Sequence, residues 1–413
     1  MPSIQPEISD DYFRQESARL VTMLTRRFGL HRLQFAEDVA QETLVRSLQT
    51  WPYQGLPDNP SAWLSQTAKN LAIDQIRRES RWSEKEGSVA LEHERWRAGG
   101  VDREDDFSFS DDALRMLFVC FHPQLSVEAQ TALALRILGG LSPAEIAAAF
   151  LTTEAAISKR LVRARQRIKE LVLPFRVPDT NELPERLDGV LGALHLLFNE
   201  GYKTSSGAQL VRTDLCQEAI RLNQLLTRHD SSCQPKSFAL LALMLLSAAR
   251  FNSRTGEGGQ LLRLREQDRS SWNAEMIQEG LFYLAQSGRG EELSEFHLMA
   301  GIAACHCTAA SDAETNWPRI LGLYEQLVLL THSPVVKLNR AVAVAQVYGA
   351  EAGLNAISEL PLESYYLFHA VRGTLMAELG RKSEAKRLLI QAKELAPSPS
   401  EREFLQTRIE ECD

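Results

Sequence analysis

The segment from Leu141 to Ile168 constrains the fold more than any other part of the chain. Ser142 and Glu145 have the S-x-x-E spacing of a helix-capping box, and a proline follows the serine, where a first helical turn tolerates it. The sequence therefore predicts a helix over Pro143–Phe150 and a three-residue break at Leu151–Thr153. Small alanines near the end of this helix allow a second helix to pack closely against it.

The second helix of this segment has two unlike faces. Its apolar residues are spaced four, three and four apart, which predicts a buried stripe of Ile157, Leu161, Ala164 and Ile168. Its other faces are basic and carry Lys159, Arg160, Arg163, Arg165, Arg167 and Lys169. This layout is typical of a helix-turn-helix, whose second helix enters a DNA major groove while arginines neutralise phosphates. A solvated basic face on an ordinary helical hairpin is the alternative.

Length and charge set wide limits on what such a segment belongs to. The chain has 413 residues, 44% of them hydrophobic, and a net charge of −8. This length predicts two or three domains. The negative charge argues against general coating of nucleic acid but permits a local basic patch. The sequence contains no long uncharged apolar run and no basic-then-apolar leader, so we expect a cytoplasmic protein without a membrane partner.

Cysteine and histidine spacing favours packing over metal binding. The six cysteines are scattered through a long chain, which predicts reduced and mostly buried thiols. Cys305, His306 and Cys307 are adjacent, but no second pair follows at a zinc-site spacing, so core packing is favoured. No nucleophile–base pairing or phosphate-binding glycine loop is evident. We therefore expect no metal, no cofactor, no catalytic residue and no enzymatic activity.

Apolar residues recur at helical spacing along nearly the whole chain, and strand-like alternation is missing, so an all-α fold is predicted. The first helical block covers about residues 10–82 and contains a Pro- and Gly-rich loop at Trp51–Pro60. A charged linker is expected over 83–108 and a second block over 109–173. Prolines then precede a third block, 185–413.

The third block shows a repeat near its end. Glu351 and Glu384 lie 33 residues apart, and each opens an apolar helix that stops at a proline. Gly380 lies where a helix pair would turn. The spacing of a first tetratricopeptide helix is matched by Trp317, Ile320, Leu321 and Tyr324. A period near 34 residues predicts a tetratricopeptide-like α-solenoid, although residues 185–300 show no clean repeat.

Two further motifs give the first block a family resemblance. The run Ala36–Leu44, AEDVAQETL, resembles the A-E-D-x-x-Q-E-x-F/L run of sigma factor region 2. The run Ala62–Arg78 resembles that family's A-W-L and A-R-N-L-A-x-D-x-x-R-R motifs, and the helix-turn-helix follows where region 4 belongs. Over about residues 10–173 the chain thus resembles an extracytoplasmic-function (group IV) sigma factor of bacterial RNA polymerase. The runs Asp111–Phe118 and Leu197–Tyr202 are similar to signatures of the subgroup with a fused tetratricopeptide-like C-terminal domain.

The resemblance implies a bacterial transcription initiation factor that binds core RNA polymerase and promoter DNA. It implies that the β′ clamp helices contact Glu37, Asp38, Gln41 and Glu42, with the β flap as a further polymerase contact. Helical spacing places these four side chains on one face, which we expect to be exposed. Carboxylates suit a basic partner, and an amide adds directional hydrogen bonds. A solvated acidic face is the alternative.

The resemblance also implies that region 2 opens the −10 element. The residues expected to contact it are Trp51, Tyr53, Trp63, Asn70, Asp74, Arg77, Arg78 and Arg81. Aromatic planes replace the stacking that melted bases lose, and arginines follow the phosphates. Two alternatives remain: Trp63 is a core residue, and the loop Trp51–Pro60 is a plain connector.

Region 4 is expected to read the −35 element. The resemblance implies contacts from Ser158, Lys159, Arg160, Arg163 and Arg167. Many relatives read G-T-V-K-S-R-L here, whereas this chain reads AAISKRL over Ala155–Leu161. Ala156 lacks the hydroxyl of the usual threonine, so the individual −35 contacts are expected to differ.

The long C-terminal block is expected to modulate initiation. A helical solenoid offers a groove suited to a peptide, a small protein or a small ligand. Asn199, Glu200 and Tyr202 are candidates for a regulatory contact or a pocket lining; a helix end closed by Gly201 is the alternative. A second candidate function is a helix-turn-helix regulator with a ligand-sensing repeat domain. That protein would not need the motif around Asp38 and Gln41.

Overall fold

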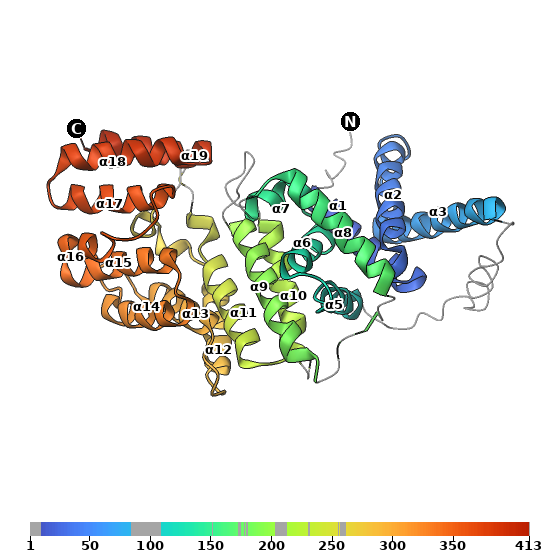
Figure 1. The fold of residues 1–413 in the computed structure, drawn as a ribbon, viewed down its shortest axis with the longest axis horizontal. Coiled ribbons are helices and arrows are strands. Elements are labelled where there is room, and N and C mark those ends of the chain that lie inside the picture. The colour runs from blue at the N-terminus through green and yellow to red at the C-terminus, as the bar shows by residue number, and fades with distance from the viewer. Residues whose placement is uncertain are drawn as a thin grey trace. The chain divides into compact units, whose positions relative to one another are not determined.

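The computed structural model (Figure 1) describes the chain in several stretches. They are residues 10–83, 109–150, 152–171, 175–176, 178, 181–202, 213–229, 232–254, 256 and 262–412. Among these described residues every regular element is a helix, so the all-α prediction is confirmed. The linker expected over 83–108 lies almost entirely outside them. The chain forms two units, residues 1–197 and 198–413.

The first unit begins with three helices. They are α1 (Asp10–Phe28), α2 (Leu33–Gln54), which follows the short 3₁₀ helix η1 (Leu30–Arg32), and α3 (Pro60–Ser83). Their apolar faces meet in a buried core that includes Leu20, Val39 and Leu64, because each helix repeats apolar residues every three or four positions.

The loop predicted at Trp51–Pro60 is shorter than expected. Helix α2 runs through Pro52 to Gln54 and ends at Gly55, whose φ of 84° suits glycine. The last turn persists because Trp51 packs into the core, 5.9 Å from the Phe13 ring and 5.4 Å from the Trp63 ring between centroids. Tertiary packing thus overrides the usual effect of a proline on a helix.

The rest of the first unit carries the helix-turn-helix. Its helices are α5 (Phe109–Cys120), α6 (Val127–Ile137), α7 (Pro143–Ala149) and α8 (Glu154–Leu171). The predicted capping box is confirmed: Glu145 accepts from the Ser142 N–H at 2.6 Å, and Ser142 Oγ accepts from the Glu145 N–H at 3.2 Å. The predicted stripe of α8 is buried from Ile157 to Ile168.

Helix α9 (Leu183–Tyr202) belongs to both units, which meet within it at residues 197 and 198. Its first half packs on α5: the Arg186 guanidinium donates to the Phe118 carbonyl at 3.4 Å. A methyl group added at Gly189 would lie 2.8 Å from the Phe121 ring, so this glycine allows the close approach.

The second unit is a succession of helices. It continues with α10 (Thr213–Arg228), α11 (Pro235–Ala248), α12 (Ala274–Ser287) and α13 (Glu295–Thr308), with the short 3₁₀ helices η2 (Phe251–Ser253), η3 (Leu264–Glu266) and η4 (Arg269–Ser271) before α12. The last helices are α14 (Trp317–Thr331), α15 (Pro334–Tyr348), α16 (Ala350–Ala356), α17 (Tyr366–Glu378), α18 (Lys382–Leu395) and α19 (Pro399–Glu410). Figure 1 shows α17 and α18 side by side, as expected for a helix pair.

Apolar clusters join these helix pairs. The first tetratricopeptide helix predicted at Trp317 is α14, and Ile320 and Leu321 are buried in a cluster with residues of α13 and α15. Gly380, with φ of 75°, makes the predicted turn between α17 and α18. None of the described helices is both long and apolar enough to cross a membrane.

Candidate nucleic-acid interface

Helix α8 presents its basic side chains to solvent. Lys159, Arg163 and Arg167 are exposed, while Ser158 and Arg160 are half-buried. The Arg160 guanidinium lies 5.7 Å from the centre of the Phe150 ring, which anchors its stem to α7. Arg167 donates to Gln124 Oε1 at 3.0 Å. A basic hollow of about 590 Å³ between α6 and α8 is lined by Lys159 and the three arginines that follow it on this face.

Thr153, the last residue of the break, caps the start of α8 with its side chain. Thr153 Oγ1 accepts from the Ala156 N–H at 3.3 Å, which satisfies one of the free donors of the first turn. Ala156 itself is half-buried. After Ala156, the half-buried Ser158 and the exposed Lys159 are the first side-chain donors of α8.

The acidic face predicted on α2 is divided. Asp38, Gln41 and Glu42 are exposed, but Glu37 is buried, so the expectation of one exposed quartet is wrong. The Glu37 carboxylate accepts from Arg165 Nε at 2.6 Å and from Arg165 Nη2 at 2.8 Å. Helical spacing placed Glu37 at the edge of the face, and a partner from α8 covers that edge.

Two further ion pairs join region 2 to region 4. Arg26 pairs with Asp112 at 3.0 Å, and Arg14 pairs with Glu145 at 3.7 Å. Asp112, at the start of α5, is buried. Sequence reasoning missed these pairs and the role of Arg165, because no local pattern links residues so far apart in the chain.

The aromatic residues expected to face melted bases divide in the same way. Tyr53 is 89% exposed. Trp51 is buried, which corrects its assignment to a DNA surface, and Trp63 is half-buried against it. The alternative that Trp63 belongs to the core therefore holds for part of its ring.

Helix α3 presents a polar face after this cluster. Asn70, Asp74, Arg77 and Arg78 are all exposed. Asn70 Oδ1 accepts from Gln66 Nε2 at 3.1 Å, and Arg77 lies 4.0 Å from Asp74. Arg81 lies on the same helix, but its side chain is outside the described residues. These side chains follow one another at helical spacing along α3.

The candidate regulatory residues lie at the end of α9. Helix α9 continues through Gly201, so the alternative of a helix end closed by that glycine is wrong. Asn199 is exposed and Glu200 is buried. Tyr202 Oη accepts from Arg250 Nη2 at 2.8 Å, and the Arg254 guanidinium lies 3.7 Å from the centre of the same ring.

The cysteine–histidine run packs inside the second unit. Cys305 is buried, and the Cys307 thiol donates to the Leu246 carbonyl at 3.4 Å. The His306 ring meets Trp317 edge-on at 5.4 Å, and burial lowers the pKa of His306 to about 4. No group of three potential metal ligands occurs within the described part of the chain.

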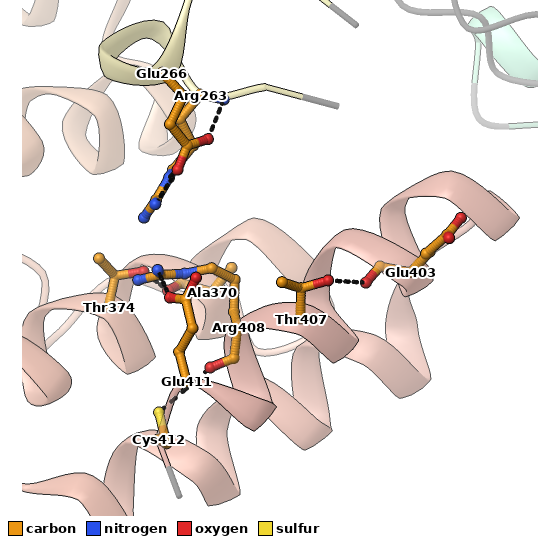
Figure 2. Close-up of polar contacts among 9 residues, drawn as sticks. All are labelled: Arg263, Glu266, Ala370, Thr374, Glu403, Thr407, Arg408, Glu411 and Cys412. Atoms are coloured by element: carbon orange, nitrogen blue, oxygen red, sulfur yellow. Dashed lines mark hydrogen bonds and ion pairs between the residues drawn. The ribbon is translucent and has the colours of Figure 1, made fainter. Parts of the chain in front are cut away.

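The second unit also contains a cavity of about 340 Å³ with an apolar floor and a charged rim. Arg263, directly before η3, and Arg408 of α19 point toward one another across it (Figure 2). Each contacts a carboxylate three residues further on, Glu266 and Glu411 respectively. Burial, and then the neighbouring Arg263, lower the pKa of Arg408.

Comparison with known proteins gives three family matches in order. Residues 13–81 match sigma-70 region 2, and residues 115–168 match sigma-70, region 4. Residues 186–288 match a family of unknown function, DUF6596. The two sigma regions in order favour an initiation factor over a helix-turn-helix regulator that acts without polymerase.

A full-length relative supports the same assignment. An uncharacterized protein of Rhizobium meliloti (strain 1021) is 39% identical over 387 residues, which is 92% of this chain and 90% of the relative. No solved structure gives a significant match. Two sigma-70 regions followed by a fused helical domain show that the chain belongs to the extracytoplasmic-function sigma factors with a C-terminal extension.

Proposed function

We propose that this sigma factor binds core RNA polymerase with α2, melts the −10 element with α3 and the loop before it, and reads the −35 element with α8. The observation that carries this proposal is the exposure of three charged helix faces on separate helices. The face of α2 is acidic, and those of α3 and α8 carry exposed arginines. One protein partner and two DNA elements call for such a division of charge.

The polymerase surface is proposed to consist of Asp38, Gln41 and Glu42, with Glu37 at its edge. Their carboxylates suit the basic β′ clamp helices, and the β flap is proposed as the partner of region 4. Placing positive charge on this face with Asp38→Arg and Gln41→Arg should abolish binding to core polymerase, measured by co-purification. Glu351→Arg, an exposed acid on α16, is the matched control. Equal binding by both variants would contradict the assignment.

The −35 surface is proposed to be Ser158, Lys159, Arg160, Arg163 and Arg167. Arg163→Ala should weaken run-off transcription from the promoter of the protein's own operon and reduce the salt slope of promoter binding by about 1. The holoenzyme is used for both measurements. Lys169→Ala, on the same helix but outside this surface, is the control. A variant that loses activity without any change in salt slope argues against a phosphate contact.

The −10 surface is proposed to be Tyr53, the loop Gly55–Asn59 and the exposed face of α3. Tyr53→Ala should lower run-off transcription from duplex promoter DNA and recover on a template that is already melted at −10, because stacking assists opening. Tyr53 is 89% exposed, so the substitution leaves the core intact. Equal loss on both templates would contradict a role in melting.

Arg77, Arg78 and Arg81 are proposed to follow the phosphates of the −10 element, and Asn70 and Asp74 are proposed as further contacts to it. We further propose that the protein acts in the cytoplasm, where the polymerase works, without catalysis or a cofactor.

The C-terminal unit is proposed to modulate initiation by binding a small organic anion in its cavity. Two guanidinium groups that face each other repel unless an oxyanion lies between them, and paired arginines suit carboxylate or phosphate groups. Their present partners Glu266 and Glu411 are 33% and 50% exposed, so water already competes for these ion pairs.

The floor of the cavity selects an apolar body for this anion. It includes Trp317, Val371, Leu375, Leu389 and Phe404. A volume of about 340 Å³ lies at the small end of ordinary ligand sites, about 300–1,000 Å³. The rim also carries Asp312 and Glu378, which disfavour a second negative group and so favour a singly charged ligand.

Calorimetric titration with carboxylates of six to twelve carbons tests this site. At least one carboxylate should bind the parent chain, and Arg408→Gln should weaken the affinity for that carboxylate about tenfold or more. Arg387→Gln, exposed on α18, is the control. Failure of the whole series to bind, or equal binding to Arg408→Gln, would contradict the site. A change in run-off transcription on adding the carboxylate connects it to regulation, and Tyr202→Phe tests whether α9 takes part.

A further inference from the structure

We propose that the cavity of the second unit is coupled to the end of α9 by a continuous chain of polar and aromatic contacts. The members of this chain, from the cavity to the helix, are Asp312, Arg269, Trp272, Arg250 and Tyr202. An anion in the cavity moves Asp312 toward Arg269, and the last turn of α9 becomes more ordered. This coupling rests on the ligand site proposed above and adds the route by which occupancy of that site reaches another helix.

Asp312 is the end of the chain of contacts that lies at the cavity. It lines the cavity, and its carboxylate lies 4.0 Å from Arg269 Nη2, about 1 Å further than an ordinary hydrogen bond. Arg269 Nη2 is buried and has no hydrogen-bond partner among the described residues. The Asp312 side chain is 43% exposed, so it has room to move. A bound anion repels the Asp312 carboxylate, and Nη2 offers that carboxylate an unused donor, so occupancy of the cavity favours closure of the gap.

Arg269 is held so that a change at Nη2 affects its neighbours. Its Nη1 donates to the carbonyls of His306 and Ala309, where α13 ends, at 2.6 and 2.8 Å. Its guanidinium lies 4.7 Å from the centre of the Trp272 ring, and its side chain is only 13% exposed. A guanidinium is planar and rigid, so a new bond at Nη2 turns the whole group against the indole ring.

Trp272 connects Arg269 to a second arginine. It is 6% exposed, and the Arg250 guanidinium lies 5.8 Å from the centre of its ring. Arg250 Nη2 in turn donates to Tyr202 Oη at 2.8 Å. Because protein interiors are close-packed, a shift of Arg269 against the indole ring also displaces Arg250 and its hydrogen bond to the tyrosine.

The chain of contacts ends at Tyr202, the last residue of α9. Its ring lies 5.8 Å from the Phe198 ring and 5.8 Å from the Phe251 ring, and its carbonyl accepts from Arg254 Nη1. The last carbonyls of a helix have no helical partners, so side chains such as Arg254 decide how well this end is ordered. Helix α9 belongs to both units, which makes its end a suitable point for a signal from the cavity.

Binding in the cavity and order at Tyr202 must affect each other equally if they are coupled. Calorimetric titration of the full chain uses the tightest-binding carboxylate of the series described above. Tyr202→Phe lies outside the cavity and should weaken the affinity for this carboxylate about fivefold, because it removes the hydroxyl that Arg250 contacts. Tyr348→Phe, at a tyrosine of α15 that is 70% exposed, is the matched control and should leave the affinity unchanged.

Two substitutions at Trp272 separate the chain of contacts from general damage. Trp272→Phe keeps an aromatic ring between the arginines, so Tyr202→Phe should still weaken carboxylate binding in this background. Trp272→Leu removes the ring, and Tyr202→Phe should then have no effect on the affinity. If Trp272→Leu does not fold, Arg269→Gln takes its place, because it breaks the same chain of contacts on the surface of the indole ring.

Hydrogen exchange gives a direct measurement at the end of α9. Saturating carboxylate should slow amide exchange in residues 199–202 of the parent about threefold or more. Asp312→Asn removes a like charge from the cavity rim, so it should bind the carboxylate at least as tightly as the parent. The slowing of exchange should nevertheless be lost, because the bound anion no longer drives this side chain toward Arg269.

Unchanged affinity in Tyr202→Phe, or equal slowing of exchange in the parent and Asp312→Asn, would overturn the proposal. If the parent binds no carboxylate, the ligand site itself fails, and a double-mutant cycle then tests the chain of contacts without a ligand. The losses in free energy of unfolding for Arg269→Gln and Tyr202→Phe should not sum to the loss in the double variant. Additive losses would show that these two residues are not coupled through Trp272.

Discussion

The contact between regions 2 and 4 contains a largely buried ion pair, whereas the contacts between successive helix pairs of the second unit contain buried apolar clusters. Ion pairs cross from region 2 to region 4, and the shortest joins Glu37 to Arg165. Helices of the second unit instead share buried clusters around Leu321, Leu338 and Leu389. Charged groups can exchange partners, whereas buried apolar surface gains nothing comparable from water. The first unit therefore depends on a desolvated charged contact between its two regions, and the second on apolar surface buried between its helices.

Removing a buried side chain from the stack should give the largest loss of stability. Leu389 is 1% exposed and packs closely against Gly373. A methyl group added to this glycine would lie only 2.9 Å from the Leu389 side chain. Leu389→Ala is expected to lower the free energy of unfolding by about 3 kcal/mol in urea denaturation of the full chain. The neighbouring Ile390, 41% exposed, provides the control, and Ile390→Ala should cost less than about 1 kcal/mol. Similar losses for both would argue against an apolar stack.

Acid should weaken both units, because each contains a half-buried histidine with a lowered pKa. Burial lowers the pKa of His195 and of His306 from 6.5 to about 4. The folded protein keeps these rings neutral, so their contribution is complete above about pH 6.5 and is lost as the pH falls toward 4. The loss should reach at most about 3 kcal/mol per histidine, measured by urea denaturation over this range.

A matched pair of variants assigns this pH dependence. His306→Gln should reduce it, while His332→Asn, at an exposed position, should leave it unchanged. A free energy of unfolding that stays constant between pH 6.5 and 4 would contradict the lowered pKa values of His195 and His306.

A double-mutant cycle on Glu37 and Arg165 measures the strength of the ion pair between regions 2 and 4. The coupling free energy between Glu37→Gln and Arg165→Gln should be about 2 kcal/mol at low salt, since both side chains are largely buried. The exposed pair Glu42–Arg46, at 54% and 49% exposure, should couple by less than about 0.5 kcal/mol. Equal coupling free energies in the two cycles would mean that burial does not strengthen the Glu37–Arg165 ion pair.

The smallest effect is expected at the helix-turn-helix cap. Ser142→Ala removes the hydroxyl that accepts from the Glu145 N–H and should cost about 1 kcal/mol in thermal or urea unfolding. Unchanged stability would show that the Glu145 side chain alone, bonded to the Ser142 N–H, satisfies the start of α7.

The helix-turn-helix could be predicted from the sequence because its signals are local. Ser142 and Glu145 lie one helical turn apart, and the stripe from Ile157 to Ile168 repeats at helical spacing. Gly380 likewise identified a turn that needs a positive φ. Each of these features depends on neighbours within a few residues, so spacing alone carries the information.

The candidate site was less predictable where distant residues decide exposure. Spacing placed Glu37 beside Asp38 on α2, but its burial depends on an arginine 128 residues away. Trp51 was assigned to a loop because Pro52 follows it, yet its contacts with Phe13 and Trp63 extend the helix and bury the ring. Neither outcome is encoded in local pattern, since both follow from tertiary packing.

Helix α3 ends at Ser83 and α5 begins at Phe109. The chain between them links Glu37 covalently to Arg165 and so favours their ion pair. Because both partners belong to one chain, each meets the other at an effective concentration on the order of millimolar. A contact too weak to hold separate molecules together is then sufficient within one chain. Proteolytic cleavage between these helices would remove this advantage, and the two halves would then bind their partners as independent proteins.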